Sequence, residues 1–334
     1  MNKRKIYYLL HNGKNSNLKY YARSYLRKLT PGIFFRMQRR HLLGQLDGRA
    51  DRDEIRQRTD YYCRLTAESP IERPLWEQQA VETRHQPMTN QSTYYHDALE
   101  YARYFDPQLR WVLLSGDTKH IPQLPSITKS RPLAGNNANN VLLNLDKNRH
   151  FLFVNDHKMW RNKRDCAIFR GDLGPHKQNR DIFMQLFANG QSPLVDAAST
   201  NRIEEHPEWQ GQKLTIGEHL DYKFVMSLEG NDVASNLKWV MSSNSIAVTP
   251  RLTCETWFME GTLKADYHYI EVKPDFSDLE ERLTYYISHP DEAEAIIRHA
   301  HEYVARFRDK ERERLVSLLV LKKYFEITNG CPCE

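Results

Sequence analysis

The sequence predicts an α/β protein with two Rossmann-like halves, and three observations lead to this fold class. Apolar runs of strand length alternate with longer segments of helical periodicity in both halves of the 334-residue chain. One stretch, Asp221–Glu260, contains strand, glycine-containing loop, helix and strand in succession, which is how parallel sheets are built. Hydrophobic residues make up 40% of the chain, enough for real cores, yet no run of about 18 apolar residues would cross a membrane.

The other predicted elements follow from the same patterns. Short apolar runs predict strands at Tyr7–Leu10, Trp111–Ser115, Phe151–Val154 and Ala167–Phe169. Helical periodicity predicts helices at Asn17–Leu43 (interrupted at Pro31 and Gly32), Asp51–Thr66, Tyr94–Phe105, Asn179–Ala188, Ser277–His289, Pro290–Phe307 and Arg312–Phe325. The strongly charged segment Asp156–Arg164 lies between two predicted strands, so we expect the domain boundary there.

The stretch Asp221–Glu260 has the pattern of a nucleotide site. Its first apolar run predicts a buried strand that is closed by Gly230, and the small polar residues of Asn231–Ser235 suit a loop that binds an anion. A short helix at Asn236–Ser242 and a strand that ends at Pro250 complete the unit. Ligands of parallel sheets bind at the carboxyl ends of the strands, which places the candidate site in these loops.

Several motifs in a fixed order resemble glycosyltransferase family 90. They are LLSGDTKHIPQLP at Leu113–Pro125, CAIFRGDLG at Cys166–Gly174, SLEGND and SNLKW at Ser227–Trp239, E-x-W-F at Glu255–Phe258, and HYIEVKPDFSDL at His268–Leu279. The resemblance covers roughly residues 110–310, and it is the combination that is specific. The family includes bacterial lipopolysaccharide core glycosyltransferases, fungal capsule xylosyltransferases and animal protein O-glucosyltransferases.

The resemblance implies a GT-B architecture, in which two Rossmann-like domains face a cleft. We expect residues 1–160 to form the acceptor-side domain and residues 161–310 to form the domain that binds the nucleotide sugar. The last helix, within residues 311–334, is then expected to cross back to the first domain.

Inverting glycosyl transfer requires one general base, which takes the proton of the acceptor hydroxyl. Asp117 comes after an apolar strand and Gly116, and the resemblance assigns it this role. From its position alone, Asp117 could equally cap the turn that follows Gly116.

The donor residues are expected in the carboxyl-terminal half, where cations and N–H groups would stabilise the departing diphosphate. Arg170, Gly171 and, less strongly, Arg180 come from the IFRGDLG segment, although Arg170 could instead pair with Asp172 or Asp181 in a surface turn. The loop and helix after the next strand contribute Ser227, Gly230, Asn231, Ser235, Asn236 and Lys238. Glu255 is predicted to accept hydrogen bonds from the ribose hydroxyls; its alternative is a surface acid beside Arg251, and that of Lys238 is a solvated helix residue.

No metal ligand and no cofactor beyond the UDP-sugar donor are predicted. Asp51-Arg52-Asp53 matches the DxD triplet of manganese-dependent glycosyltransferases, but it lies in a charged, helix-prone run and not after a strand. The five cysteines, including Cys331 and Cys333, are widely spaced and odd in number, which favours a reducing cytoplasm over a disulfide framework.

The formal charge of +5 is unevenly distributed. The first 45 residues contain eleven Lys or Arg, no Asp or Glu, and several aromatic residues. Such a segment suits an anionic membrane surface, a glycolipid or a nucleic acid, or it is simply a solvated face over a core stripe. Because the rest of the chain is near neutral or acidic, we expect no nucleic-acid partner.

Together these features predict a metal-independent inverting enzyme that moves a hexose from a UDP-sugar to a lipopolysaccharide core acceptor. The amino terminus has no signal-peptide pattern, so we expect a cytoplasmic protein bound peripherally to the inner face of the inner membrane. Capsule polysaccharide or a protein serine are alternative acceptors. A basic nucleic-acid-binding protein is the alternative from another class.

Overall fold

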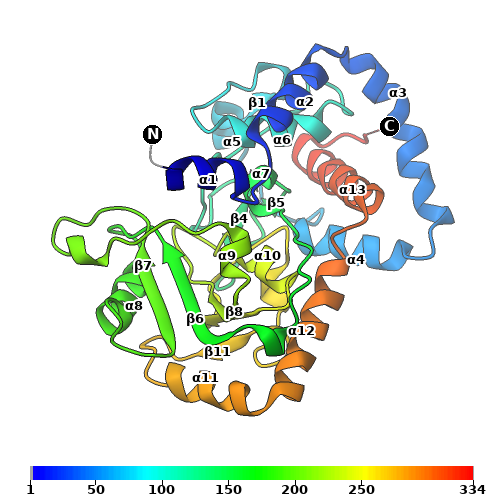
Figure 1. The fold of residues 1–334 in the computed structure, drawn as a ribbon. Helices are drawn as coiled ribbons and strands as arrows, with labels where there is room; N and C mark the ends of the chain where they lie inside the picture. The colour runs from blue at the N-terminus through cyan, green and yellow to red at the C-terminus, as the bar shows by residue number, and fades with distance from the viewer. Residues whose placement is uncertain (1–2, 334) are drawn as a thin grey trace. The chain divides into compact units, whose positions relative to one another are not determined.

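The computed structural model describes residues 3–333, which contacts divide into two compact units. Unit 1 comprises residues 3–15, 149–252 and 260–306, and unit 2 comprises residues 16–148, 253–259 and 307–333. Figure 1 shows the course of the chain through both. The domain ranges expected from the sequence assign functions as well as boundaries, and they stay predictions.

Unit 1 is built on a five-stranded sheet in which every neighbouring pair is parallel. Its strands are β6 (Arg164–Gly171), β7 (Val195–Ser199), β8 (Tyr222–Met226), β9 (Ile246–Pro250) and β11 (Ile270–Val272). Their spatial order is β11-β9-β8-β6-β7, so the strands, counted first to fifth along the chain, lie in the order 2-1-3-4-5. This is the order of doubly wound α/β sheets, and it confirms the predicted α/β class.

Helices cover this sheet because their apolar faces need burial. The helices of unit 1 are α1 (Lys3–His11), α8 (Gln178–Phe187), α9 (Ile216–His219), α10 (Leu237–Met241), α11 (Leu279–Ser288) and α12 (Pro290–Ala305). In Figure 1, α8 lies beside β7, while α11 and α12 run below the sheet and contact β11 and β9 respectively. Phe169, Phe183, Phe224 and Val248 belong to the continuous core between these layers.

The sequence correctly predicted the central unit of this sheet, β8-α10-β9. In β8 all five residues are buried, as a strand covered on both faces requires. Met226 pairs with Val248 in the parallel register of β8 and β9.

Unit 2 is mainly helical. Its helices are α2 (Asn17–Leu29), α3 (Gly32–Gly44), α4 (Arg52–Tyr62), α5 (Arg73–Gln79), α6 (Ser92–Ala102) and α13 (Lys310–Asn329), and α7 (Lys147–His150) spans the limit between the units. Its strands pair in twos: β1 (Val81–Glu82) with β2 (Arg110–Trp111), β3 (Ser126–Thr128) with β5 (Asn140–Leu142), and β4 (Ser130–Pro132) with β10 (Cys254–Thr256). A second extended sheet is not seen in the described part of unit 2, and GT-B remains a proposal.

Helix α13 is the element on which unit 2 is assembled, since it packs against α3, α4, α6 and β2. Its ends are set by local chemistry. The Asp309 carboxylate accepts from the backbone N–H groups of Glu311 and Arg312, and Gly330 ends the helix in the left-handed conformation, with φ of 69°.

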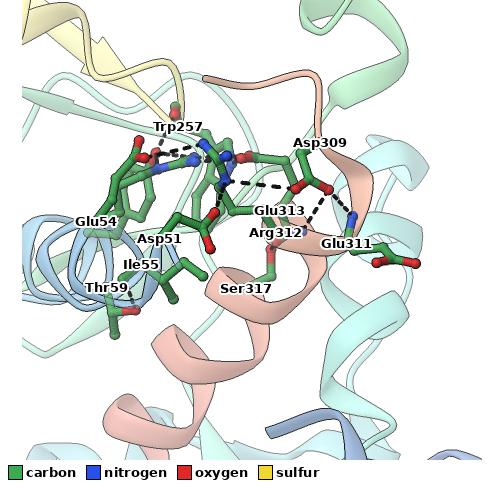
Figure 2. A network of polar contacts seen from close by, with 12 residues as sticks. Asp51, Glu54, Ile55, Thr59, Trp257, Asp309, Glu311, Arg312, Glu313 and Ser317 are labelled. Atoms are coloured by element: carbon green, nitrogen blue, oxygen red, sulfur yellow. Dashed lines mark hydrogen bonds and ion pairs between the residues drawn. The ribbon is translucent and has the colours of Figure 1, made fainter. Parts of the chain in front are cut away.

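A buried ion pair joins α13 to α4. The Arg58 side chain is 1% exposed, and its Nη1 lies 2.6 Å from Oε1 of Glu313. The Trp257 indole N–H donates to the other oxygen of Glu313, and the Arg58 guanidinium lies over the ring of Phe307. Figure 2 shows the surrounding contacts, in which Arg312 of α13 pairs with Asp51 and Glu54 of the α4 region.

Two predicted strands are wrong. Tyr7–Leu10 belongs to helix α1, because the segment continues from Lys3, Arg4 and Lys5, which favour a helix, and has no neighbouring strand to pair with. Phe151–Val154 forms no strand; the Val154 N–H donates to the hydroxyl of Ser242 and not to a sheet neighbour. The run Trp111–Ser115 contributes only the end of β2 and an isolated parallel bridge from Leu113 to Ile127.

We expect Arg58→Met to lower the free energy of unfolding by about 3–5 kcal/mol, because it leaves the Glu313 carboxylate buried without its counter-charge. Urea denaturation of both proteins measures this difference. Lys323→Gln is the matched control, since Lys323 also pairs α13 with α4 (through Asp60) but at the surface. That variant should lose less than about 1 kcal/mol. Equal losses in the two variants would contradict the assignment.

Candidate active site

The sheet of unit 1 has one point where ligands are expected to bind. In the order 2-1-3-4-5 the chain reverses direction across the sheet between β6 and β8, and the loops after these strands diverge there. β6 ends at Gly171, and the loop after β8 begins at Ser227. The structure therefore brings Arg170, Gly171, Ser227 and Gly230 to the same edge of the sheet, at the switch point.

Arg180, near the start of α8, joins the two loops. Its guanidinium donates to the Asp172 carbonyl and to Asp172 Oδ1, both at 2.8 Å, and to the carbonyls of Leu228 at 2.9 Å and Glu229 at 3.3 Å. Burial lowers the pKa of Arg180, and the Asp172 carboxylate opposes that effect. These bonds hold the loop after β6 at a fixed place relative to the loop after β8.

Close packing explains why glycine occupies two positions in these loops. A Cβ atom at Gly171 would lie 2.6 Å from Cζ of Phe169, which is buried in the core. A Cβ atom at Gly230 would lie 2.9 Å from Nη2 of Arg180. Both loops thus approach neighbouring side chains more closely than any larger residue would permit.

Two hydroxyls at the ends of β8 and β9 have no hydrogen-bond partner. Ser227 is fully buried, and its N–H donates to the Val248 carbonyl at 2.8 Å, but its Oγ is unpaired. Thr249, 1% exposed, has an unpaired Oγ1 on the neighbouring strand. Buried hydroxyls normally find a partner, so these two are available to a ligand oxygen at this edge of the sheet. The sequence identified Ser227 but not Thr249, although Thr249 follows the apolar run of β9 in the same way.

Arg170 is already bonded to the protein. Its Nη2 lies 2.7 Å from Oδ1 of Asp196, and its Nη1 donates to the carbonyls of Phe169 and Asp196. The partner is a residue of β7, and neither Asp172 nor Asp181, which the sequence had suggested, is bonded to it. A diphosphate would have to compete with Asp196 for this guanidinium. The role of Arg170 in binding the sugar donor stays a prediction.

The other donor residues after β8 differ in their surroundings. Asn231 and Ser235 are exposed, while Asn236 precedes α10 and donates to the Met226 carbonyl at 3.0 Å. Lys238 is not the solvated helix residue that the sequence left open: its side chain is fully buried, and Nζ lies 2.8 Å from Oε1 of Glu260. The Lys238 charge therefore has an internal counter-ion.

Asp117 lies in unit 2, after Gly116, whose φ of 111° favours glycine. Its carboxylate accepts a hydrogen bond from the Tyr94 hydroxyl at 3.0 Å and forms an ion pair with the ammonium of Lys129. The Lys129 side chain is almost completely buried, whereas that of Asp117 is 17% exposed. An ammonium in direct contact with a carboxylate stabilises its negative charge and fixes its orientation.

Lys129 was missed at the level of sequence. It lies between β3 and β4, in a segment whose neighbours are almost all buried, and a lysine among buried residues requires a counter-charge. A lysine among buried residues was therefore the signal that could have pointed to an ion pair, but nothing in the sequence identifies Asp117 as its partner.

Glu255 also lies in unit 2, apart from the other predicted donor residues, which all belong to unit 1. It is fully buried in β10, and its Oε1 lies 2.7 Å from Nε of Arg131, while the Tyr61 hydroxyl donates to Oε2. Burial raises the pKa of Tyr61, and the Glu255 charge adds to that effect. Glu255 is thus not the surface acid left open by the sequence, and its role toward a ribose stays a prediction.

Two features of residues 3–333 bear on metals and membranes. No group of three or more His, Cys, Asp or Glu side chains in that range is arranged to hold a metal ion. None of the helices in that range combines the length and the apolar character needed to cross a bilayer.

Comparison with known proteins identifies a family and relatives that this chain resembles. The family model described as glycosyl transferase family 90 matches residues 142–326. O-glucosyltransferase LpsA of Dichelobacter nodosus is 38% identical over 276 residues, which span 83% of this chain and 84% of that protein. Protein O-glucosyltransferase 1 of Rattus norvegicus is 26% identical over 157 residues, 43% of this chain and 38% of that protein.

We expect Gly171→Ala to lower the free energy of unfolding by about 1–3 kcal/mol, because the new methyl group overlaps the Phe169 ring. Gly174→Ala is the matched control in the same loop. A Cβ there meets no atom within 4 Å, so the change should be within about 1 kcal/mol of zero. Thermal or urea unfolding measures both, and Phe169→Leu should partly restore the Gly171→Ala protein. A harmless Gly171→Ala would contradict the packing argument.

Proposed function

The chain belongs to glycosyltransferase family 90, and on that basis we propose an inverting, metal-independent GT-B enzyme that moves a hexose from a UDP-sugar to a lipopolysaccharide core acceptor. Its being a glycosyltransferase follows from the family and from its 38% identity to an O-glucosyltransferase. The donor, the acceptor, the stereochemistry and the independence from metal are the proposed part.

The observation that supports the donor site best is the sheet order 2-1-3-4-5, because the loops that follow β6 and β8 diverge at the switch point. Two of the motifs that resemble the family reach these loops, Arg180 holds the loops together, and Ser227 has an unpaired hydroxyl there. We assign the nucleotide diphosphate to this edge of the sheet.

The proposed chemistry uses a carboxylate and a cationic anion site. Asp117 accepts the proton of the acceptor hydroxyl as its oxygen attacks the anomeric carbon, and the nucleotide diphosphate departs with the bonding electron pair. Arg170, Arg180 and the N–H groups of the loop after β8 are the groups that would stabilise the growing negative charge. Lys129 pairs with the Asp117 carboxylate and orients it for the proton transfer.

Glucose is the first sugar to test, since the relative from Dichelobacter nodosus is named an O-glucosyltransferase. A lipopolysaccharide core is the proposed acceptor; the similarity to protein O-glucosyltransferase 1 makes a protein serine the alternative. A nucleotide-release assay with a panel of UDP-sugars and both acceptors, run with and without EDTA, separates these possibilities. Complete loss of activity with EDTA, restored by manganese, would contradict metal independence.

The basic amino-terminal helices support peripheral membrane binding. Leu18, Leu26 and Leu29 on α2 are 81%, 68% and 80% exposed, and they share a helix face by their spacing. Phe34 and Met37 on α3 are also exposed, at 55% and 72%. Apolar side chains on a strongly cationic helix pair are what an anionic bilayer surface binds. We propose that α2 and α3 contact the inner face of the inner membrane.

We expect Asp117→Asn to reduce transfer by about two orders of magnitude or more, because an amide cannot accept the proton. Binding of UDP should be unchanged, and the unfolding curve should remain close to that of the parent. The measurement is the initial rate with saturating donor and acceptor. Asp106→Asn, an exposed residue of unit 2, is the control and should keep full activity. An active Asp117→Asn enzyme would move the base elsewhere, with Asp172 as the next candidate.

We expect the triple variant Leu18→Ser, Leu26→Ser, Leu29→Ser to bind phosphatidylglycerol vesicles at least about tenfold more weakly than the parent, since it removes the exposed apolar contacts. Vesicle co-sedimentation at low and high salt measures this, and added salt should weaken parent binding. Ile182→Ser with Leu186→Ser on α8 is the control, because these side chains are also apolar and exposed, at 41% and 43%, but lie on a helix without the cationic excess. If the triple variant bound vesicles as tightly as the parent, the exposed face of α2 would be a solvated surface and not a membrane contact.

A further inference from the structure

A cavity in unit 2, apart from every residue discussed as donor ligand or base, is lined by cations. Its volume is about 290 Å³, at the lower end for pockets that hold small molecules. Helices α2, α3 and α6 provide most of the wall, and α2 contacts α6 directly (Figure 1). The cationic side chains in the lining are Arg27, Lys28, Arg36, Arg84 and Arg103.

The negative charge in this lining is small and already compensated. Among the described residues that line the cavity, the one carboxylate is Glu100. It pairs with Arg27 at 2.6 Å and with Lys147. Burial alone would raise the pKa of Glu100, but the charges of Lys147 and Arg27 outweigh it and lower the pKa. Lys28, Arg36 and Arg103 form no ion pair with any described carboxylate, so the cavity has a net positive charge.

Two nitrogens in the lining have no hydrogen-bond partner. His96 is only 5% exposed, and its Nε2 is unpaired among the rings of Tyr25 and Tyr95. Nη1 of Arg103 is likewise buried and unpaired, although Nη2 of the same guanidinium donates to the Thr30 carbonyl. Buried nitrogens without partners are rare in folded proteins, and a bound oxygen acceptor would satisfy the Arg103 N–H groups and His96 in its Nε2-protonated tautomer.

The repulsion between these groups also favours an anion. Burial and the charges of Lys28 and Arg27 lower the pKa of His96, and burial and Arg27 lower the pKa of Arg103. A phosphate between them would replace mutual repulsion with charge-assisted hydrogen bonds.

The rest of the lining is apolar or aromatic and fits more than an inorganic ion. Tyr95 and Leu99 provide flat or apolar surface next to the cations. The cavity thus combines donors for a phosphate with a surface on which a sugar ring can pack. A free phosphate would leave that apolar part empty.

We propose that this cavity binds the phosphate monoester of a phosphorylated sugar. This proposal deepens the proposed function and rests on it in one respect only, the origin of the ligand. The phosphorylated sugar would be a part of the acceptor that does not react. Arg36, Lys28 and Arg103 hold the phosphate oxygens, with His96 Nε2 as a further partner, while Tyr95 and Leu99 contact the ring.

The test measures binding and not transfer, so its failure is distinguishable from failure of the proposed function. Isothermal titration calorimetry uses the full chain with saturating UDP, so that the donor site is occupied. The probes are glucose 6-phosphate, inorganic phosphate, glucose and phosphatidylglycerol vesicles. We expect glucose 6-phosphate to bind more tightly than phosphate, and glucose to bind at least tenfold more weakly than its phosphate.

The variant Lys28→Gln with Arg36→Gln should weaken glucose 6-phosphate binding at least tenfold. Both residues lack ion pairs in the described structure, so the variant is expected to fold, and its unfolding curve verifies this. The matched control, Arg23→Gln with Arg40→Gln, removes two cations from the same helices outside the cavity and should bind as the parent does.

Three results would overturn the proposal. They are equal binding of glucose 6-phosphate by the parent and the cavity variant, equal binding of glucose and its phosphate, and loss of binding in the control variant as large as in the cavity variant. Binding of vesicles but not of glucose 6-phosphate, lost in the cavity variant alone, would reassign the cavity to a lipid headgroup and also overturn it.

Discussion

The constraint on which the candidate site of unit 1 depends is the parallel direction of five strands. Because all five run the same way, the residues after β6, β8 and β9 meet at one edge, although up to about eighty residues of chain separate them. The 2-1-3-4-5 order adds the second condition, a place where neighbouring loops diverge. Arg180 then fixes the two diverging loops relative to each other through four hydrogen bonds. The chemistry of the site follows from this geometry more than from any single side chain.

Buried ion pairs are the second recurring feature of this structure. They distinguish the cations that stabilise the fold from the cations that can bind a ligand. Arg58–Glu313, Arg131–Glu255 and Lys238–Glu260 are all strongly buried, so each cation already has its counter-charge. Breaking such a pair leaves an isolated charge in the interior, which costs about 3–5 kcal/mol. A substitution at Lys238 therefore reports on stability as much as on donor binding, whereas Lys28 and Arg36 can be changed without that complication.

The sequence predicted those parts of the fold whose signals are local. The β8-α10-β9 unit was correct because a buried apolar run, a glycine, and small polar residues occur within one short stretch. The strand predicted at Tyr7–Leu10 was wrong because four apolar residues fit a helix face as well as a strand, and only a neighbouring strand would decide. The ion-pair partner of Arg131 was not predictable, since Glu255 is 124 residues away in the chain. No local pattern linked Lys129 to its partner Asp117 either. The resemblance identified the family, but it could not show that Glu255 is buried.

The cationic amino-terminal segment is uniform in sequence, but the structure divides it into groups with different roles. Arg4 pairs with Glu218 and Arg27 with Glu100, so these two charges are compensated within their own units. Lys28 and Arg36 line the cavity of unit 2, while Arg23 and Arg40 are exposed outside it. A single count of eleven cations would assign all of them to a membrane surface. A bilayer and a phosphorylated sugar are both anionic. Surface attraction can therefore be distinguished from a defined binding site only by comparing substitutions of cations at different positions on the same helices.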